Sequence, residues 1–237
     1  MTEGLFRADA YLREAAATVL SSGPGGIVLD RTIFYPQGGG QPGDLGALIL
    51  DGSEETAIVN TVYAADRKTI LHAPAEGAAL PPQGSRVVAR IDWEKRYQRM
   101  RAHTALHLLS VVLPYPVTGG SVGDGEGRLD FDSGDAAVEK ADVERRLNEL
   151  IALDAKVSQR WIADEELEAN PALIKTMMVK PPMGTGRVRL IEIEGLDLQP
   201  CGGTHVARTR EIGRASVTQI EKKGRLNRRV RIALAND

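Results

Sequence analysis

The chain has 237 residues, of which 42% are hydrophobic and 26% are charged, and these proportions are ordinary for a soluble globular protein. Thirty basic residues nearly balance 32 acidic ones, so the net charge of −2 argues against a general polyanion binder but permits a local basic patch. The single cysteine excludes an intrachain disulfide framework and fits a reducing compartment. No stretch approaches the ~20 apolar residues of a membrane span, and the charged N-terminus does not resemble a secretory signal. We therefore expect a cytoplasmic protein with no membrane partner.

The first part of the chain is predicted to be rich in β-strands. Short apolar runs alternate there with clusters of Gly, Pro and Asp, and about ten residues separate one run from the next, which is typical of a small barrel. The predicted strands are Gly26–Leu29, Ala47–Leu50, Ala57–Tyr63 and Arg86–Ile91. His72 stands alone in a β-like run, where a hydrogen-bonded strand residue is the simplest interpretation.

The pattern changes at Asp92. Residues Asp92–Leu113 contain no Gly or Pro and predict a long helix with Asp92 as its N-cap, and a Gly-rich loop is predicted over Thr118–Gly127. The remaining predicted elements are the strands Arg128–Asp132, Lys156–Ile162, Arg187–Ile193, Ala215–Ile220 and Arg229–Leu234, and the helices Ala141–Leu153 and Asp164–Ala169. The sequence thus predicts a β module over residues 1–91, which includes a Gly-rich loop, and an α+β module over residues 92–237.

Three of the four histidines and the only cysteine fall into two pairs with the same spacing. His103 and His107 lie four residues apart on the predicted long helix, so both face the same side. Cys201 and His205 repeat that interval in the segment CGGTH. One thiolate and three imidazoles form a ligand set that Zn²⁺ favours. The alternative is that all four are satisfied core residues.

The two glycines between Cys201 and Thr204 allow two interpretations. Gly202 and Gly203 permit a tight turn, so they either only shape the ligand loop or present amide donors to a developing oxyanion. Zinc held by four protein atoms is usually structural, whereas a catalytic ion keeps one position for water, and spacing alone does not separate the two cases. Thr104 and Thr204 adjoin ligand positions, where helix packing or turn capping is the expected role.

Five segments in a fixed order resemble one known family. HTALHLL (103–109), RLDFD (128–132) and QPCGGTH (199–205) resemble the editing domain of alanyl-tRNA synthetases, which also occurs in free-standing alanyl-tRNA editing proteins. FYPQGGGQPGD (34–44) resembles the N-terminal module of that family, and KGRLNRRVRI (223–232) resembles its closing hairpin. These segments extend over nearly the whole chain.

The resemblance implies an α+β protein: a translation-factor-like β-barrel, followed by the α+β editing domain shared by threonyl- and alanyl-tRNA synthetases. It implies a trans-editing hydrolase, an aminoacyl-tRNA deacylase that removes serine or glycine from mischarged alanine tRNA. It assigns the zinc-site positions to His103, His107, Cys201 and His205. The chain has no GxxxxGK or GxGxxG segment and no room for an aminoacylation domain, so ATP-dependent charging is not expected.

The resemblance also suggests two substrate-contacting segments. Thr118 stands where the synthetase editing domain carries a glutamine, so its hydroxyl either contacts the seryl hydroxyl or a water, or simply belongs to a turn. The loop placed near the editing pocket or the tRNA end is Gln37, Gly38, Gly39, Gly40 and Gln41. A plain hairpin turn is the alternative for this loop.

Six basic residues lie within ten positions near the C-terminus: Lys222, Lys223, Arg225, Arg228, Arg229 and Arg231. Such a run is often only a solvated face, but here Arg228 and Arg229 are candidates for contacts with tRNA phosphates. The arginines of the long helix, Arg96, Arg99 and Arg101, are expected to extend this surface.

Two other functions remain open at this point. One is a zinc-stabilised tRNA-binding module without catalysis, and the other is editing of a different mischarged aminoacyl-tRNA. A zinc peptidase is disfavoured, because HTALH lacks the glutamate base of an HExxH helix.

Overall fold

The computed structural model describes residues 2–50, 54–175, 186–224 and 226–235. The chain divides into two compact units, Met1–Tyr97 and Gln98–Asp237. The division falls inside helix α1 (Trp93–Val112), a few residues beyond the change of pattern at Asp92. No helix within these residues is long and apolar enough to cross a membrane.

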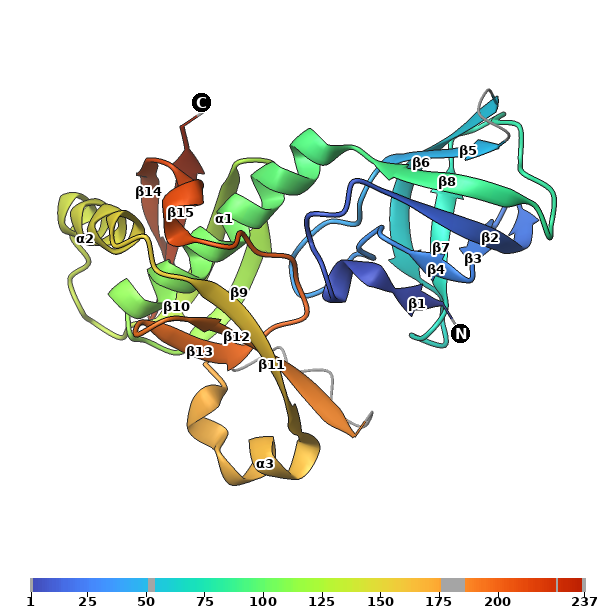
Figure 1. Cartoon of the computed structure of the whole chain (residues 1–237). Helices are drawn as coiled ribbons and strands as arrows, with labels where there is room; N and C mark the ends of the chain where they lie inside the picture. Colours follow the sequence, from blue (N-terminus) through green and yellow to red (C-terminus); the bar gives the residue numbers. More distant parts are fainter. Residues whose placement is uncertain (1, 51–53, 176–185, 225, 236–237) are drawn as a thin grey trace. The chain divides into compact units, whose positions relative to one another are not determined.

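The first unit is a closed six-stranded barrel, drawn in blue to blue-green in Figure 1. Its strands are β2 (Glu14–Gly23), β3 (Gly26–Leu29), β5 (Gly46–Leu50), β6 (Glu54–Tyr63), β7 (Ile70–Pro74) and β8 (Arg86–Ile91). They close antiparallel in the order β2-β3-β7-β6-β5-β8. A short parallel pair, β1 (Glu3–Gly4) and β4 (Arg31–Thr32), and the 3-10 turn η1 (Leu5–Arg7) complete the unit. The prediction of a small barrel is confirmed.

Alternation along the strands explains the core of the barrel. In β8 the exposed and buried residues alternate strictly, so that Val87, Ala89 and Ile91 face inward. They pack with Val19, Ile27 and other residues of β2, β3, β5 and β6 in one apolar cluster. Strand β2 is an addition that the sequence patterns did not predict, and β7 corresponds to the β-like run around His72.

The first turn of α1 belongs to the barrel unit. Asp92 caps the helix, because its carboxylate accepts a hydrogen bond from the Lys95 amide at 3.2 Å. Arg96 is fully buried, forms an ion pair with Asp44 and donates to the carbonyl of Ile33 at 2.6 Å. The expectation that Arg96 lies on a basic surface is therefore wrong. A buried guanidinium needs a paired carboxylate, and Asp44 supplies it from within the same unit.

The second unit contains a four-stranded antiparallel sheet in the order β14-β15-β10-β9. Its strands are β9 (Val117–Val122), β10 (Glu126–Asp132), β14 (Ala215–Lys223) and β15 (Asn227–Leu234). Helix α2 (Lys140–Ala152) packs against β14, and α1 lies across the sheet in Figure 1. Close packing between α1 and β10 places Leu106 against Gly127.

The predicted Gly-rich loop over Thr118–Gly127 is wrong, because most of this segment is strand. Gly120 lies opposite Leu129, whose side chain would be only 2.9 Å from a Cβ at this position. A Cβ at Gly127 would lie 3.0 Å from the side chain of Leu106. These glycines therefore permit close packing within the sheet and against α1, rather than a loop conformation.

A three-stranded sheet, β11 (Val157–Ala163), β12 (Arg187–Ile193) and β13 (Asp197–Pro200), completes the second unit. One face of this sheet packs Ile162, Val188 and Leu190 against Leu167 of helix α3 (Asp164–Ala169). Two 3-10 turns, η2 (Pro171–Leu173) and η3 (Thr209–Ile212), lie outside the sheet. The opposite face of the sheet carries the residues that contact α1.

Candidate metal centre

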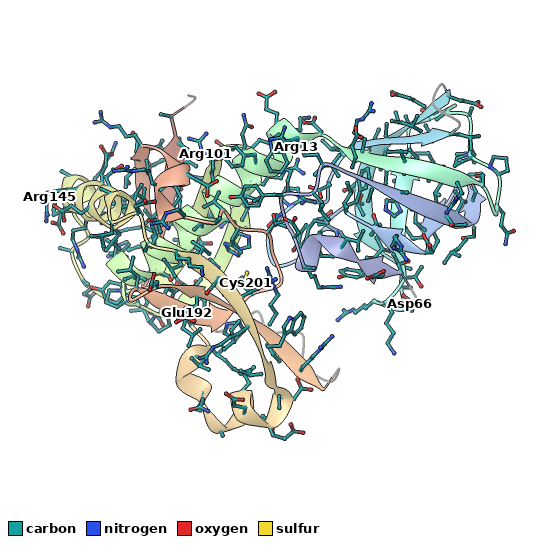
Figure 2. All side chains as sticks on the ribbon, in the orientation of Figure 1. Arg13, Asp66, Arg101, Arg145, Glu192 and Cys201 are labelled. Atoms are coloured by element: carbon teal, nitrogen blue, oxygen red, sulfur yellow. The ribbon has the colours of Figure 1, made fainter. Side chains whose placement is uncertain are left out.

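Two distant segments bring four potential ligands together. Helix α1 presents His103 and His107 one turn apart, and the loop after β13 presents Cys201, labelled in Figure 2, and His205. The ligand atoms of all four residues lie within 4.8 Å of one another. Cys201 Sγ lies 3.5 Å from His103 Nε2 and 3.3 Å from His205 Nε2.

This donor set fits a transition-metal ion. Bonds of about 2.3 Å to sulfur and 2.0–2.1 Å to nitrogen would separate tetrahedral ligands by roughly 3.3–3.7 Å, close to the two sulfur–nitrogen distances. The histidines are buried and the cysteine is half-buried, so four soft or borderline donors meet away from bulk water. The four residues together could bind a metal ion.

The histidine rings are held by hydrogen bonds at their other nitrogens. His107 Nδ1 lies 3.1 Å from the carboxylate of Asp197, which accepts the proton of that nitrogen. His205 Nδ1 lies 3.2 Å from the Thr104 hydroxyl, which donates in turn to the carbonyl of Met100. These contacts favour the neutral tautomers in which Nδ1 carries the proton and Nε2 directs its lone pair at the cluster. Thr104 thus contacts a candidate ligand in addition to its helix-packing role.

Asp197 is the centre of a buried polar network that the sequence analysis missed. Its carboxylate accepts hydrogen bonds from Gln199 Nε2 at 2.7 Å and from Lys175 Nζ at 2.5 Å, in addition to the contact with His107. Residues 197, 199 and 201 alternate along one strand and its end, so their side chains share a face. This alternate spacing could have indicated that Asp197 and Gln199 lie beside Cys201, but only if β13 had been predicted as a strand.

The charges around the cluster favour a cation at its centre. Burial raises the pKa of the Cys201 thiol, but the neighbouring His103 and His205 outweigh burial and hold it well below its usual range. Burial lowers the pKa of His107, yet hydrogen bonds to Asp197 and Cys201 raise it to about 9. Burial, followed by the charge of His103, lowers the pKa of His205 to about 3. A thiolate and a carboxylate therefore stabilise the positive charge that His107 carries at neutral pH, whereas the ring of His205 stays neutral.

The CGGTH loop is held in place by Arg189. This buried side chain donates to the carbonyls of Cys201 at 3.1 Å and Gly203 at 2.7 Å. The Gly203 amide donates to Cys201 Sγ at 3.4 Å, which stabilises a thiolate, whereas Gly202 is exposed with open space around its Cα. Of the two candidate oxyanion donors, Gly203 thus already has an acceptor in the sulfur.

Thr118 lies at an irregularity in β9. Its hydroxyl is 3.2 Å from both the carbonyl of Asp130 and the side-chain oxygen of Asn227. The residue therefore belongs to a polar group formed by β9, β10 and β15, and not to a free turn.

The loop of Gln37 to Gln41 is a tight hairpin in the first unit. Gly38 and Gln41 form a two-way backbone pair with distances of 3.1 and 2.9 Å. Gly39 and Gly40 between them have φ angles of 56° and 81°, a backbone region that favours glycine. The Gln37 side chain is exposed and that of Gln41 is buried. The hairpin alternative accounts for the glycines.

Arg229 and Arg231 of the basic run near the C-terminus are paired with acidic side chains, and Arg225 lies outside the residues that the structure describes. Arg229 forms a two-pronged ion pair with Asp130, with distances of 2.7 and 2.8 Å, and Arg231 donates to Glu221 at 2.8 Å. Arg228 donates to the carbonyl of Asn227. The pKa of Asp130 is lowered, chiefly by the hydrogen bond from Arg229.

The arginines of α1 in the second unit do not extend this surface, contrary to expectation. Arg99 is buried and donates to Asp124 at 2.6 Å. Arg101 is also buried and donates to the carbonyls of Ile212 and Ala235. Each guanidinium finds its acceptors inside the unit, so these residues serve packing.

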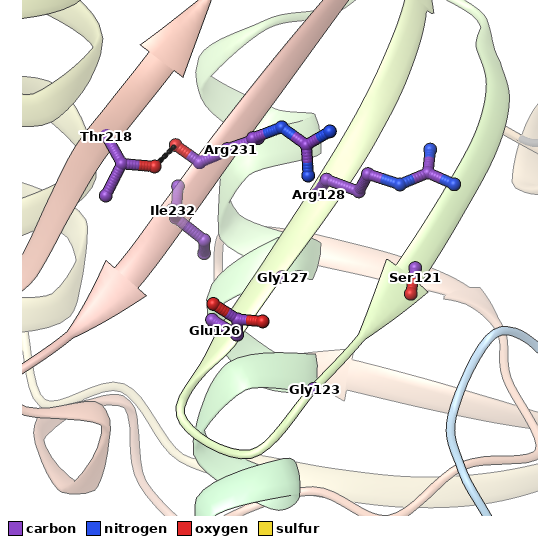
Figure 3. A pocket seen from close by; sticks show the side chains of 8 residues that line it. All are labelled: Ser121, Gly123, Glu126, Gly127, Arg128, Thr218, Arg231 and Ile232. Atoms are coloured by element: carbon purple, nitrogen blue, oxygen red, sulfur yellow. Dashed lines mark hydrogen bonds between the residues drawn. The ribbon is translucent and has the colours of Figure 1, made fainter.

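A shallow pocket of about 120 Å³ lies on the four-stranded sheet, apart from the candidate metal ligands. Figure 3 shows the side chains of Arg128 and Arg231 on neighbouring strands beside it, with Glu126 near the β9–β10 turn. Arg128 pairs with Asp130 and Arg231 with Glu221, but Asp130 is shared with Arg229 and Glu221 with Lys223, so the charge is only partly neutralised.

Two family models match the chain. The model described as threonyl and alanyl tRNA synthetase second additional domain matches residues 188–231, which include the CGGTH loop. The model described as tRNA synthetases class II (A) matches residues 6–95, which include the barrel.

Full-length relatives decide the family. The alanyl-tRNA editing protein AlaX-M of Methanosarcina mazei is 36% identical, with 99% of this chain and 97% of the relative aligned. The AlaX-M protein of Methanosarcina barkeri is 34% identical over the full length of both chains. This chain belongs to the alanyl-tRNA editing protein family.

The alanyl-tRNA editing family also shares this region with a much larger protein. The alanine–tRNA ligase of Korarchaeum cryptofilum is 38% identical over 231 residues, but these make up only 25% of the ligase. The editing proteins match from end to end, so the comparison favours them over the ligase as the model for this chain.

Proposed function

We propose that this protein is a trans-editing hydrolase that deacylates mischarged alanine tRNA, with Ser-tRNA as the main substrate and Gly-tRNA as a second one. It breaks the ester between the wrong amino acid and the terminal ribose and releases free tRNA. It is an aminoacyl-tRNA deacylase and does not carry out ATP-dependent charging. Its setting is the cytoplasm, where translation supplies the substrate.

Editing of this kind is needed because a binding pocket cannot discriminate alanine well from glycine or serine. A missing methyl group is worth only about 1–3 kcal/mol in a pocket, and a pocket rejects an added hydroxyl poorly. A second hydrolytic site can instead select the wrong product. The relatives named as alanyl-tRNA editing proteins supply the substrate class for this proposal.

The observation that carries the proposal is the convergence of His103, His107, Cys201 and His205, with Nε2 of two rings kept free by Asp197 and Thr104. We assign this cluster to Zn²⁺. When bound, zinc polarises a carbonyl or a water in the site. The protein itself orients the rings, stabilises the thiolate through the Gly203 amide and excludes bulk water from the buried histidines.

The remaining site residues are proposed contacts with the substrate. The exposed Gly202 amide stabilises the developing oxyanion, in a loop that Gly203 shapes through its bond to Cys201 Sγ, and Thr118 contacts the seryl hydroxyl or its water. Gln37, Gly38, Gly39, Gly40 and Gln41 form a loop for the tRNA end, and Arg228 and Arg229 contact phosphates. We assign residues 1–91 to a translation-factor-like barrel and residues 92–237 to the editing domain.

One observation favours a second function, a zinc-stabilised tRNA-binding module without catalysis. Four protein ligands within 4.8 Å of one another resemble a closed structural zinc site. Editing of another mischarged tRNA is the remaining alternative.

A deacylation panel separates these functions. Alanine tRNA charged with serine, glycine or alanine is incubated with the protein, with and without a zinc chelator. The proposal predicts fast release of serine, slower release of glycine, intact Ala-tRNA and loss of activity with the chelator. A binding module would bind tRNA and hydrolyse none of the three. Fast hydrolysis of a mischarged threonine tRNA alone would favour the other editing function.

A further inference from the structure

Trp161 on β11 is a large apolar side chain that faces solvent. It is 43% exposed, whereas its neighbour Ile162 is buried against α3. The guanidinium of Arg187 lies over the indole ring, 4.7 Å from the ring centroid. The ring is thus held from one side by a cation while part of its surface stays open.

Strand register places this ring on the same face as the metal cluster. Directly opposed residues of an antiparallel pair share a face of the sheet. Between β11 and β12, Trp161 lies opposite Arg189 and Gln159 lies opposite Ile191. On the next strand Ile191 lies opposite Gln199. Gln199 and Asp197 are the residues that reach the ring of His107. The indole and these residues therefore share the face directed at α1.

The separation between Trp161 and the cluster is short. Trp161 and Arg189 are on adjacent strands, and the Arg189 carbonyl accepts a hydrogen bond from the Cys201 amide at 3.1 Å. Two strand spacings amount to about 10 Å between the backbones of Trp161 and Cys201. One terminal nucleoside with an esterified amino acid can bridge such a gap, with the base at one end and the ester at the other.

The chemistry of this pair suits a nucleobase. Proteins recognise unpaired RNA bases by stacking them on aromatic rings and on arginine guanidinium planes, and stacking accepts every base. The 3′ end of tRNA is single-stranded, so its terminal base is free to stack. An indole with an arginine on the site-bearing face provides that platform.

We propose that Trp161, supported by Arg187, is a stacking platform for the unpaired 3′-terminal base of the tRNA substrate. The platform rests on the proposed function, since it is the ester attached to this nucleotide that would reach the cluster. Trp161 positions substrate and takes no part in bond breaking.

Steady-state kinetics of Ser-tRNA deacylation provide the first test. Trp161→Ala is expected to raise KM about tenfold while kcat changes less than twofold, because stacking is a binding interaction. Trp161→Phe should retain most of the affinity, since it keeps an aromatic face. Leu153→Ala is the matched control, because Leu153 is also an exposed apolar residue of this unit, at 61%. Unchanged KM in Trp161→Ala would contradict the platform.

Fluorescence titration tests stacking without catalysis. Trp93 and Trp161 are the two tryptophans of the chain, so Trp93→Phe leaves Trp161 as the only indole reporter. Titration with an uncharged CCA trinucleotide should quench this fluorescence with saturation, and absence of quenching overturns the platform. If the wild-type protein fails to deacylate Ser-tRNA, the proposed function fails instead, and the titration still decides the platform.

Discussion

At the level of single residues, the candidate metal centre depends on what lies behind its ligands. His107 and His205 direct Nε2 at the cluster because Asp197 and Thr104 occupy Nδ1. The carboxylate of Asp197 remains charged, because hydrogen bonds from His107, Lys175 and Gln199 outweigh burial and lower its pKa to about 2. A charged acceptor makes the ring of His107 a better metal ligand.

Asp197→Asn is expected to weaken zinc binding about 10- to 100-fold, because an amide replaces the charged partner of His107 with little change in size. Competition with a chelator of known affinity measures this change. Asp135→Asn, at an exposed carboxylate of the same unit, should leave zinc affinity unaltered. Zinc affinity equal to that of the wild type in Asp197→Asn would show that this contact does not orient His107.

At the level of elements, the barrel contains a histidine that must stay neutral. His72 on β7 is buried, with Nδ1 2.9 Å from the carbonyl of Ile27 and Nε2 2.8 Å from the Thr32 hydroxyl. Burial lowers its pKa to about 4, and the hydrogen bond to Ile27 offsets only part of this effect. The strand prediction for His72 is confirmed.

The barrel is expected to lose stability as the pH falls from about 6.5 toward 4. The unfolded chain binds a proton near pH 6.5, whereas folded His72 does so only near pH 4. The stabilisation is therefore complete above the unfolded value and is lost on acidification. Between pH 7 and pH 5 this group accounts for roughly 2 kcal/mol of the free energy of unfolding.

Denaturant unfolding followed through Trp93 measures this effect, with Trp161→Phe as the background so that only the barrel unit reports. His72→Gln should be less stable at pH 7 but should show a smaller loss between pH 7 and pH 5. An equal loss in both proteins would mean that His72 does not titrate as described.

The predicted elements succeeded where periodicity was strong and local. Helix α1 and strand β8 were predicted from the periodicity of their apolar residues and from the turn residues around them. The two Cys/His pairs were predicted from their four-residue spacing. The segment Thr118–Gly127 was wrongly predicted as a loop because glycine is rare in strands. Its glycines are required by the close approach of Leu106 and Leu129, which belong to other elements. Local patterns do not contain that information.

The arginines show the same limit for the site. Arg96 and Arg99 look like surface charges in a helix sequence, but each is buried because an aspartate distant in the sequence pairs with it. Asp197 and Lys175 were missed for a related reason: Asp197 contacts His107 only where β13 meets α1, and Lys175 reaches Asp197 from outside that strand. The candidate metal ligands can be found in the sequence because they occur in pairs four residues apart. The groups that orient their rings show no such regular spacing.

At the level of the whole molecule, the groups assigned to chemistry lie in the second unit. The four candidate ligands, the Asp197 network and the Trp161 platform are all within Gln98–Asp237, while the Gly38–Gln41 hairpin belongs to the barrel. The net charge of −2 argues against a general polyanion binder, and two arginines of β15, Arg229 and Arg231, are paired with Asp130 and Glu221. Recognition of tRNA therefore depends on particular contacts more than on total charge.

Hydrolysis in the proposed function depends on the metal held by the Cys/His cluster, and the Cys201→Ala variant measures that dependence. Zinc content and the rate of Ser-tRNA deacylation are measured on the same samples of wild type and variant. We predict that the variant loses its zinc and that its rate falls roughly hundredfold or more. Zinc added to the chelator-treated wild type should restore activity, and the same addition should leave the variant inactive. Deacylation by Cys201→Ala at the wild-type rate after complete loss of metal would show that hydrolysis does not need the metal.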